Sequence, residues 1–262
     1  MTLVVSDISN MGVIMVGDSA VTRSQNGIQE VIPGAVKVQY SSKANIGFAI
    51  WGNADVGNSR MDYWISNFIQ HEIQSSENVE DVGQKLVNQL NPILSASGKP
   101  WKDLVRGIHI AGYREGFPCL YHIHCGHNNE PAHELRFYKD FPDDQSWSES
   151  YFKYLLNFAF IHLRNGYHPL FGPLFDHVLE YSKELRANFN ISFPQRTLRG
   201  RFQFYKLLVR FVAGTLTASG IHQGVNDVLS SIAFNKDGLV IDERMELEEP
   251  PPDYNANLTS YF

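Results

Sequence analysis

The chain has 262 residues, of which 43% are hydrophobic and 19% charged, so it can bury a sizeable core and is not a disordered or low-complexity protein. Lysine and arginine number 22 against 28 aspartate and glutamate, and the net charge of −6 argues against a general attraction to nucleic acid or an anionic membrane. No stretch approaches the ~20 apolar residues of a membrane span, and the N-terminus has no basic region typical of a secretory signal. Because two cysteines, Cys119 and Cys125, cannot form a disulfide framework, we expect a cytoplasmic, reducing setting.

The first fifty residues are predicted to form two β-hairpins. Residues 3–5 and 13–16 are rich in β-branched side chains and are separated by the turn-forming stretch 9–12. A second pair of strands is expected at 36–40 and 46–51, with a mostly polar connection between them. A sheet therefore begins at the very start of the sequence.

Helical periodicity follows these hairpins. Apolar residues between 61 and 69 recur at intervals of three and four, which predicts a helix with one buried stripe. A second helix is expected to begin after Asn78, which is a suitable N-cap with Glu80 and Asp81 in the first turn, and to end near Pro92.

The second half of the chain returns to strands, then helices, then strands. Residues 128–150 are polar and irregular and give no firm prediction. The other elements, in chain order, are expected to be strands at 107–113 and 119–124, a densely apolar segment at 151–163, helices around 174–185 and 204–216, and a final hairpin of 228–234 and 239–241 closed by the turn at 235–238.

Strands and helices thus occur in separate blocks, which favours an α+β domain over an alternating one. Antiparallel hairpins with helices on both faces would form a four-layer αββα sandwich, with an enlarged helical region near residues 150–215. We expect this domain to span residues 1–241. Residues 242–262 carry four glutamates and three consecutive prolines and are expected to form a flexible or docking tail.

Thr2 is the first candidate functional residue. Removal of Met1 would leave a threonine with a free α-amine beside its own β-hydroxyl. The amine has a pKa of roughly 7.7–8.0, so near neutral pH it can take the proton of a hydroxyl that is otherwise a poor nucleophile. Taken alone, a threonine in this position is more often an ordinary strand residue.

Three later residues strengthen this interpretation. Asp18 ends an apolar strand and Lys37 interrupts another. A charged side chain in such a strand does not contribute to apolar packing and is usually paired or solvated. We expect the two to pair beneath Thr2, with the lysine charge keeping the neighbouring amine neutral. Gly52 lies where a strand gives way to a helix, and its N–H could approach a substrate closely and donate to an oxyanion.

Together these residues resemble the proteasome β-type subunits and their bacterial proteasome-like relatives, which are N-terminal-nucleophile (Ntn) threonine peptidases. Members begin with a mature threonine and continue with a strand ending in Asp-Ser-x-x-Thr, which matches residues 18–22. Their next strand pair carries a lysine and ends in Gly-x-x-Asp, which matches Lys37 and residues 52–55, with a longer loop expected at 25–33. The similarity covers about two thirds of the chain, and this N-terminal combination is fairly specific.

The resemblance implies an αββα Ntn-hydrolase fold, no cofactor, and a role for each matching residue. Thr2 would be the nucleophile and its α-amine the base, Lys37 would tune the amine, Asp18 would hold Lys37, and the Gly52 N–H would form the oxyanion hole. It also implies a peptide or unfolded protein as substrate, a self-compartmentalised homo-oligomeric ring, and an ATP-dependent unfoldase as a further partner.

The same resemblance places a substrate site. The backbone around Thr22 would align a peptide as an extra strand, and Val21, Ala35 and Ile50 would line the pocket beside the scissile bond. All three side chains are apolar, which predicts cleavage after apolar residues.

The sequence departs from the family in one respect and leaves other functions open. The family also uses a serine and an Asp-x-x-Ser group near the amine, whereas residues 217–224 have no aspartate at that place, and Ser219 or His222 would have to substitute. The alternatives are an Ntn amidohydrolase acting on a small amide and a catalytically silent scaffold. The joint presence of all four site residues argues against the scaffold, because packing alone does not require them.

Two remaining clusters are given an ordinary interpretation. Residues 122–127 include four side chains that suit zinc, but we expect them to be solvated turn residues that bind no metal. The four are His122, His124, Cys125 and His127. Basic residues gather near the last long helix, and we expect a solvated face or subunit contact rather than a nucleic-acid site; these are Arg196, Arg199, Arg201, Lys206 and Arg210.

Overall fold

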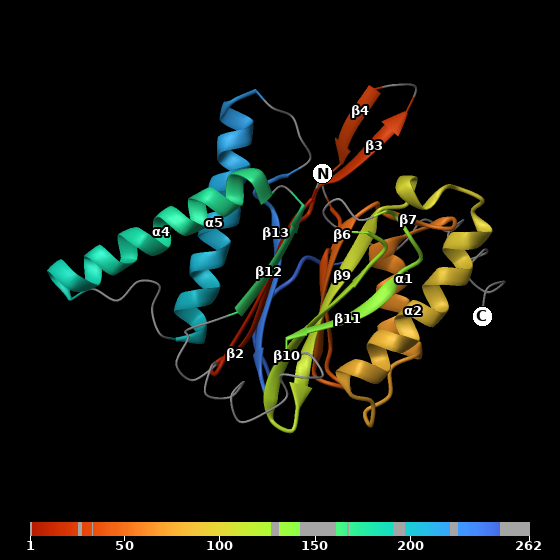
Figure 1. Cartoon of the computed structure of the whole chain (residues 1–262), viewed down its shortest axis with the longest axis horizontal. Helices are drawn as coiled ribbons and strands as arrows, with labels where there is room; N and C mark the ends of the chain where they lie inside the picture. The colour runs from red at the N-terminus through yellow and green to blue at the C-terminus, as the bar shows by residue number, and fades with distance from the viewer. Residues whose placement is uncertain are drawn as a thin grey trace.

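The computed structural model describes residues 2–25, 28–32, 34–126, 131–141, 161–166, 168–190, 197–220 and 225–246. Two five-stranded antiparallel sheets pack face to face, and helices cover the outer face of each (Figure 1). The α+β class with antiparallel sheets is confirmed.

The first sheet begins with the predicted N-terminal hairpin, which lies at its centre. Along its first strand, Leu3 and Val5 face a helix pair, whereas Val4 and Ile8 face the other sheet, as expected for a strand buried on both sides. The strands in spatial order are β12 (Ile161–Gly166), β1 (Leu3–Ser9), β2 (Gly12–Asp18), β13 (Leu229–Asn235) and β14 (Gly238–Glu243).

The second sheet joins the second hairpin to the predicted central hairpin. Its strands in spatial order are β11 (Arg136–Phe141), β10 (Phe117–His124), β9 (Arg106–Arg114), β6 (Ile46–Gly52) and β5 (Val38–Ser41). The β11 strand falls in residues 128–150, for which no firm prediction was possible.

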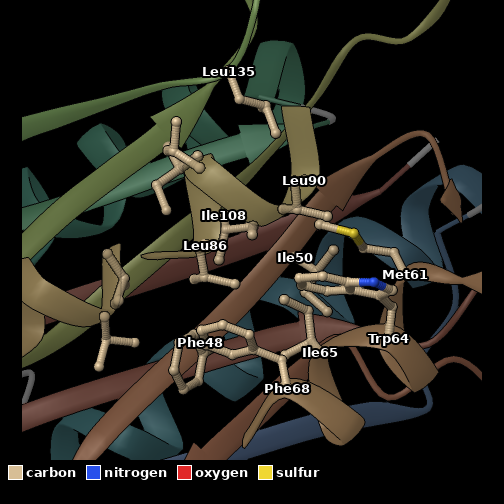
Figure 2. Packing of buried hydrophobic residues seen from close by; sticks show 14 of the residues in the cluster. Phe48, Ile50, Met61, Trp64, Ile65, Phe68, Leu86, Leu90, Ile108 and Leu135 are labelled. Carbon is tan, nitrogen blue, oxygen red and sulfur yellow. The ribbon is translucent and has the colours of Figure 1, made fainter. Parts of the chain in front are cut away.

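Helices α1 (Met61–His71) and α2 (Val79–Ala96) cover the second sheet as predicted. Figure 2 shows Phe48 and Ile50 of β6 packed between Trp64 of α1 and Leu86 of α2. Asn78 caps α2 as expected: its side chain accepts hydrogen bonds from the backbone N–H groups of the first turn and completes a capping box.

Helix α5 (Leu198–Ala218) covers the first sheet, and helix α4 (His168–Phe189) packs on α5 with its first half and extends away from the sheet (Figure 1). The apolar segment at 151–163 was expected to belong to this helical region, but its last residues begin strand β12, which pairs with β1. Residues 151–160 lie outside the described ranges.

The predicted loop at 25–33 is largely a hairpin of β3 (Val21–Gln25) and β4 (Ile28–Ile32). The missed signal is the dipeptide Asn26-Gly27 between two runs with strand character, which favours a two-residue hairpin turn. Three short elements complete the description: β7 (Asp55–Val56), β8 (Ser59–Arg60) and the 3-10 helix η1 (Trp101–Asp103).

Strand β14 runs to Glu243, so the first residues of the predicted tail are part of the first sheet. Residues 247–262 lie outside the described ranges, and the division at 241 remains a prediction. Among the helices in the described ranges, none combines the length and apolar character that crossing a bilayer requires.

Candidate functional site

The N-terminal hairpin brings Asp18 next to the start of the chain. Strands β1 and β2 are antiparallel with Val4 opposite Gly17, so the last residue of β2 lies beside the first residue of β1. The Leu3 N–H donates to Asp18 Oδ1 at 2.7 Å. Thr2, which precedes β1, is therefore held next to this carboxylate, and only 6% of its surface is exposed.

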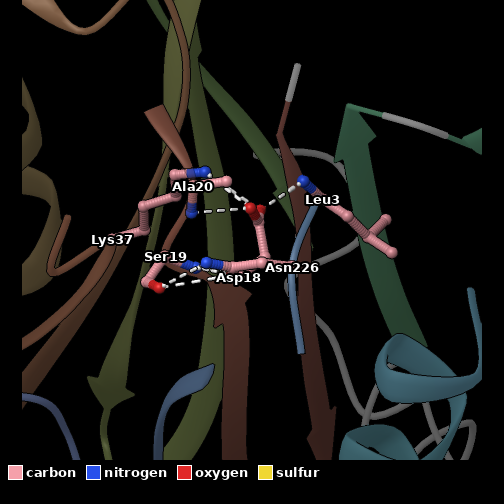
Figure 3. A network of polar contacts seen from close by, with 6 residues as sticks. All are labelled: Leu3, Asp18, Ser19, Ala20, Lys37 and Asn226. Atoms are coloured by element: carbon pink, nitrogen blue, oxygen red, sulfur yellow. Dashed lines mark hydrogen bonds and ion pairs between the residues drawn. The ribbon is translucent and has the colours of Figure 1, made fainter. Parts of the chain in front are cut away.

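Lys37, the residue before β5, binds the same carboxylate from the side of the second sheet, although the sequence predicted that it lies inside a strand (Figure 3). Its Nζ lies 2.9 Å from Asp18 Oδ1 and 3.0 Å from Oδ2, and the Ala20 N–H donates to Oδ2 at 3.0 Å. The expected ion pair is thus present. Because Oδ1 accepts from both Lys37 and Leu3, the ammonium lies beside the backbone that follows Thr2.

The absence of a side chain at Gly17 lets Lys37 reach across the interface between the sheets. A Cβ at Gly17 would lie 3.1 Å from Val4 Cγ1, 3.3 Å from Val38 Cγ2 and 3.4 Å from Lys37 Cβ. These are contacts from both sheets, so the two backbones approach closely where the ion pair forms. A Cβ here would press mainly on Val4 and Val38, while its contact with the Lys37 stem would be an ordinary one.

The charges at the site are buried. Side-chain exposure is 8% for Lys37 and nil for Asp18. Burial lowers the pKa of the Lys37 ammonium, while Asp18 and, more weakly, Asp62 oppose this shift. A buried ion pair is strongly destabilised when one partner is removed, because the other is left without a counter-charge.

Asn226 is a polar contact of the site that sequence reasoning missed. Its side-chain Oδ1 accepts from the Ser19 N–H at 3.0 Å, and its Nδ2 donates to Ser19 Oγ at 3.0 Å. Ser19 directly follows Asp18, so Asn226 holds the backbone next to the residue that carries the carboxylate (Figure 3). The two residues are 207 positions apart, and no local pattern signals such a contact.

Gly52 is the last residue of β6 and has a φ of +88°, which disfavours side chains other than that of glycine. A Cβ there would lie 2.5 Å from the Val105 carbonyl oxygen and 2.6 Å from Arg106 Cα. Backbone packing against β9 therefore accounts for this glycine without any catalytic role. Its assignment to an oxyanion hole remains a prediction.

The expected substrate-pocket residues lie close to the ion pair in the chain and in the fold. The Ala35 N–H donates to the Ser19 carbonyl at 3.0 Å, and the Ile50 N–H donates to the Lys37 carbonyl at 2.8 Å. Val21 begins β3 and is buried, as are Ala35 and Ile50. Thr22 continues β3, where its backbone pairs with Val31.

Of the two substitutes considered for the missing serine and aspartate, only Ser219 lies in the described ranges. Ser219 is exposed at the C-terminal end of α5, where its hydroxyl donates to the Thr215 carbonyl. His222 lies outside the described residues.

The histidine and cysteine cluster is buried rather than solvated. His122 accepts a hydrogen bond from Trp51 Nε1 at 3.0 Å, and His124 stacks on Tyr138 at 4.2 Å between ring centroids. Burial raises the pKa of the Cys125 thiol, which disfavours the thiolate that binds metal. No group of three metal-binding side chains occurs within the described part of the chain, from which His127 is excluded.

The basic cluster near α5 is likewise only partly solvated. Arg201 and Lys206 are buried, and they pair with Asp7 and Glu243 respectively. Arg199 and Arg210 are exposed, and Arg196 lies outside the described residues. The interpretation as a solvated face is therefore wrong for Arg201 and Lys206, because the inner side of α5 uses these two cations in ion pairs with the first sheet. A solvated face or subunit contact remains a prediction for the exposed residues.

Comparisons with known proteins identify the fold. No family model and no curated protein matches the sequence. A mutant of Anbu from Hyphomicrobium sp. strain MC1 is similar in structure, with a TM-score of 0.58 and 11% identity over 100% of this chain and 93% of the other. Anbu from Yersinia bercovieri, described as an ancestral beta-subunit, has a TM-score of 0.57 and 12% identity, covering 99% of this chain and 96% of the other. A further Hyphomicrobium Anbu structure gives 0.51 and 13%, covering 99% and 92%.

These neighbours correct the family expected from the sequence. They are Anbu proteins, a proteasome-like but distinct family, so the assignment to proteasome β-type or bacterial proteasome-like threonine peptidases is wrong. What the likeness establishes is that this chain has the fold of the Anbu structures.

Proposed function

We propose that the chain is an N-terminal-nucleophile hydrolase, a threonine-type endopeptidase on the Anbu-like fold, in which Thr2 becomes the nucleophile once Met1 is removed. One observation carries the proposal: a single buried carboxylate, that of Asp18, binds both the Lys37 ammonium and the Leu3 N–H. This contact places a fixed positive charge beside the residue whose amine must act as a base. Packing alone does not require an ion pair at this place.

The chemistry follows from that charge. The ammonium of Lys37 disfavours protonation of the neighbouring Thr2 amine, which can then accept the proton of the Thr2 hydroxyl. The hydroxyl oxygen attacks the carbonyl carbon of the substrate, and the Gly52 N–H donates to the resulting oxyanion. The protonated amine then delivers its proton to the leaving amine, and water hydrolyses the threonine ester.

The substrate is proposed to be a peptide or unfolded protein that binds as an added strand along the backbone at Thr22. The buried side chains of Val21, Ala35 and Ile50 support a preference for an apolar residue before the scissile bond. A set of fluorogenic peptides that differ only at this residue tests the preference, and faster cleavage after acidic or basic residues contradicts it.

The assembly is proposed to be a homo-oligomeric ring that encloses its active sites, served by an ATP-dependent unfoldase. Support comes from the Yersinia neighbour, which is described as a subunit and shares the fold over nearly the whole chain. Sedimentation velocity on the purified protein tests the ring, and a monomer at micromolar concentration contradicts it.

A second candidate is a catalytically silent scaffold with the same fold. It is favoured by the position of Ser219, which is exposed at the end of α5 instead of lying beside the Thr2 amine. In that case the Asp18–Lys37 pair would serve only to join the two sheets.

A peptide epoxyketone separates the candidates, because its ring closure needs both the hydroxyl and the free amine of an N-terminal threonine. We expect intact-mass and peptide mass spectrometry to show loss of Met1 and one adduct at Thr2. The Thr2→Ala and Lys37→Met variants should not form it, whereas Lys236→Met, which changes an exposed lysine in a turn, should label normally.

The remaining outcomes each decide the matter. No adduct on a protein that has lost Met1 supports the scaffold. An adduct without cleavage of any peptide supports an amidohydrolase acting on a small amide instead of an endopeptidase.

A further inference from the structure

A second buried carboxylate, that of Asp62, lies behind the segment that carries Lys37. Asp62 is the second residue of α1 and is 4% exposed. Its Oδ2 accepts the Val36 N–H at 3.0 Å. Val36 directly precedes Lys37, so this contact acts on the backbone from which the lysine side chain starts.

Arg60 holds the Asp62 carboxylate in this orientation. Its Nε donates to Asp62 Oδ1 at 3.0 Å, and its Nη2 contacts Oδ2. The same Nη2 donates to the Gly34 carbonyl at 3.0 Å. Arg60 and Asp62 together therefore bind the chain at residues 34 and 36.

These contacts matter because the chain is not yet in a sheet at this point. Strand β5 begins at Val38, so residues 34–37 have no regular ladder to hold them. Gln39 adds a third link, since its Nε2 donates to the Asp62 carbonyl at 2.7 Å. The start of α1 thus contributes to the path of the backbone into Lys37, together with the backbone hydrogen bonds of Ala35 and Lys37 described above.

We propose that Asp62, oriented by Arg60, is a positioning residue that fixes the backbone at residue 36 and so keeps the Lys37 ammonium on Asp18 beside Thr2. Asp62 does not act on substrate, and its effect passes through Lys37. The inference rests on the proposed function for its kinetic consequences, but the structural link between Asp62 and Lys37 can be measured without any activity.

Two variants of Asp62 separate a hydrogen-bonding role from a general loss of stability. Asp62→Ala removes the acceptor for the Val36 N–H, whereas Asp62→Asn keeps one oxygen for that N–H and loses only the acceptor for Arg60 Nε. Glu80→Ala is the matched control, because it also removes a carboxylate from the first turn of a helix. The ion pairs that it breaks, with Arg114 and Lys139, lie at the end of β9 that is farther from Gly52.

Two readouts are independent of catalysis. In Asp62→Ala we expect amide exchange at Val36, followed by NMR, to speed up at least about tenfold, because the amide loses its buried partner. Acylation of Lys37 by acetic anhydride, followed by mass spectrometry, should speed up similarly. Asp62→Asn should stay within about threefold of the parent in both, and Glu80→Ala should leave both unchanged.

The kinetic readout is the split between kcat and KM, or between the inactivation rate and the binding constant for the epoxyketone. Asp62→Ala should lower kcat, or the inactivation rate, by about 10- to 100-fold. It should change KM, or the binding constant, by less than about threefold, because a displaced lysine disturbs the catalytic geometry without removing substrate contacts. Asp62→Asn should recover most of the loss. If Asp62→Ala does not fold, Arg60→Gln, which frees the carboxylate to rotate, should show the same pattern at smaller size.

Two results overturn the inference: unchanged exchange at Val36 in Asp62→Ala, and an equal loss in Asp62→Asn and Asp62→Ala. If the parent protein itself forms no adduct at Thr2, the proposed function fails, while exchange and acylation still decide whether Asp62 positions Lys37.

Discussion

At the scale of single residues, the site depends on one carboxylate with several donors. Asp18 joins the Lys37 side chain to the backbone of Leu3, so its two oxygens connect the two sheets at the start of the chain. Replacing either charged partner leaves the other buried without a counter-charge.

The first prediction concerns Asp18→Asn. We expect this variant to lose about 3–5 kcal/mol of unfolding free energy, since the Lys37 ammonium remains buried without an anion. Urea unfolding followed by tryptophan fluorescence measures the loss. The double variant Asp18→Asn, Lys37→Met should recover part of it, and a double variant that is less stable than the single one would contradict the explanation.

The second prediction concerns pH. Burial lowers the pKa of Lys37, so the ammonium loses its proton at a lower pH than an ordinary lysine. The rate of epoxyketone labelling at Thr2 should therefore fall on the alkaline side below pH ~10.4, the value for an unperturbed lysine. Lys37→Arg keeps its charge throughout this range, so any labelling that it retains should lack this fall. The same alkaline fall in both proteins would show that another group causes it.

At the scale of elements, the sequence predicted the hairpins and helices whose patterns are local. The strands β1, β2, β9 and β10 follow from runs of β-branched and apolar residues, and α2 follows from its periodicity and its cap at Asn78. An acidic residue at a strand end and a lysine in an apolar run were enough to predict the Asp18–Lys37 pair.

Contacts between distant segments were not predictable in this way. Asp62 binds the backbone of Val36 and Asn226 binds that of Ser19, and in both cases a side chain meets a backbone group that carries no sequence signature. Charge counts also failed to show that Arg201 is buried, because burial depends on which face of α5 meets the sheet.

The third prediction separates the two constraints on Gly52. Gly52→Ala should be destabilised by more than about 2 kcal/mol, since it combines a positive φ with backbone atoms within 2.6 Å of the added Cβ. Gly116 is the matched control, because its φ is +82° and nothing lies within 4 Å of an added Cβ. Gly116→Ala should cost only about 1 kcal/mol. Equal losses in urea unfolding would mean that the close approach of β9 to Gly52 is not a constraint.

At the scale of the whole molecule, the first sheet and its helices are joined by a buried charge. Asp7 of β1 lies 2.5 Å from Arg201 Nη2 and accepts from the Tyr205 hydroxyl at 2.9 Å. Burial raises the pKa of Asp7 to about 7, although Arg201 and Tyr205 act in the opposite direction.

The fourth prediction follows from this shift. Because the pKa of Asp7 is higher in the folded chain than in the unfolded chain, its protonation stabilises the fold below about pH 4, and this contribution is lost as the pH rises to about 7. Below about pH 4, where it is fully present, the contribution to the unfolding free energy is on the order of 4 kcal/mol. Urea unfolding between pH 4 and pH 7 measures it, and Asp7→Asn, which cannot titrate, should flatten the profile. A parent that loses no more stability than Asp7→Asn between pH 4 and pH 7 would contradict the sign.

The origin of Asp18 and Lys37 in different sheets has a consequence for the order of events during maturation. The carboxylate comes from β2, and the ammonium comes from the segment that enters β5, so neither hairpin alone contains the pair. A nascent or half-assembled polypeptide can carry a free terminal threonine and still lack the cation beside it. Any reactivity that depends on this pair therefore requires that the two layers have docked.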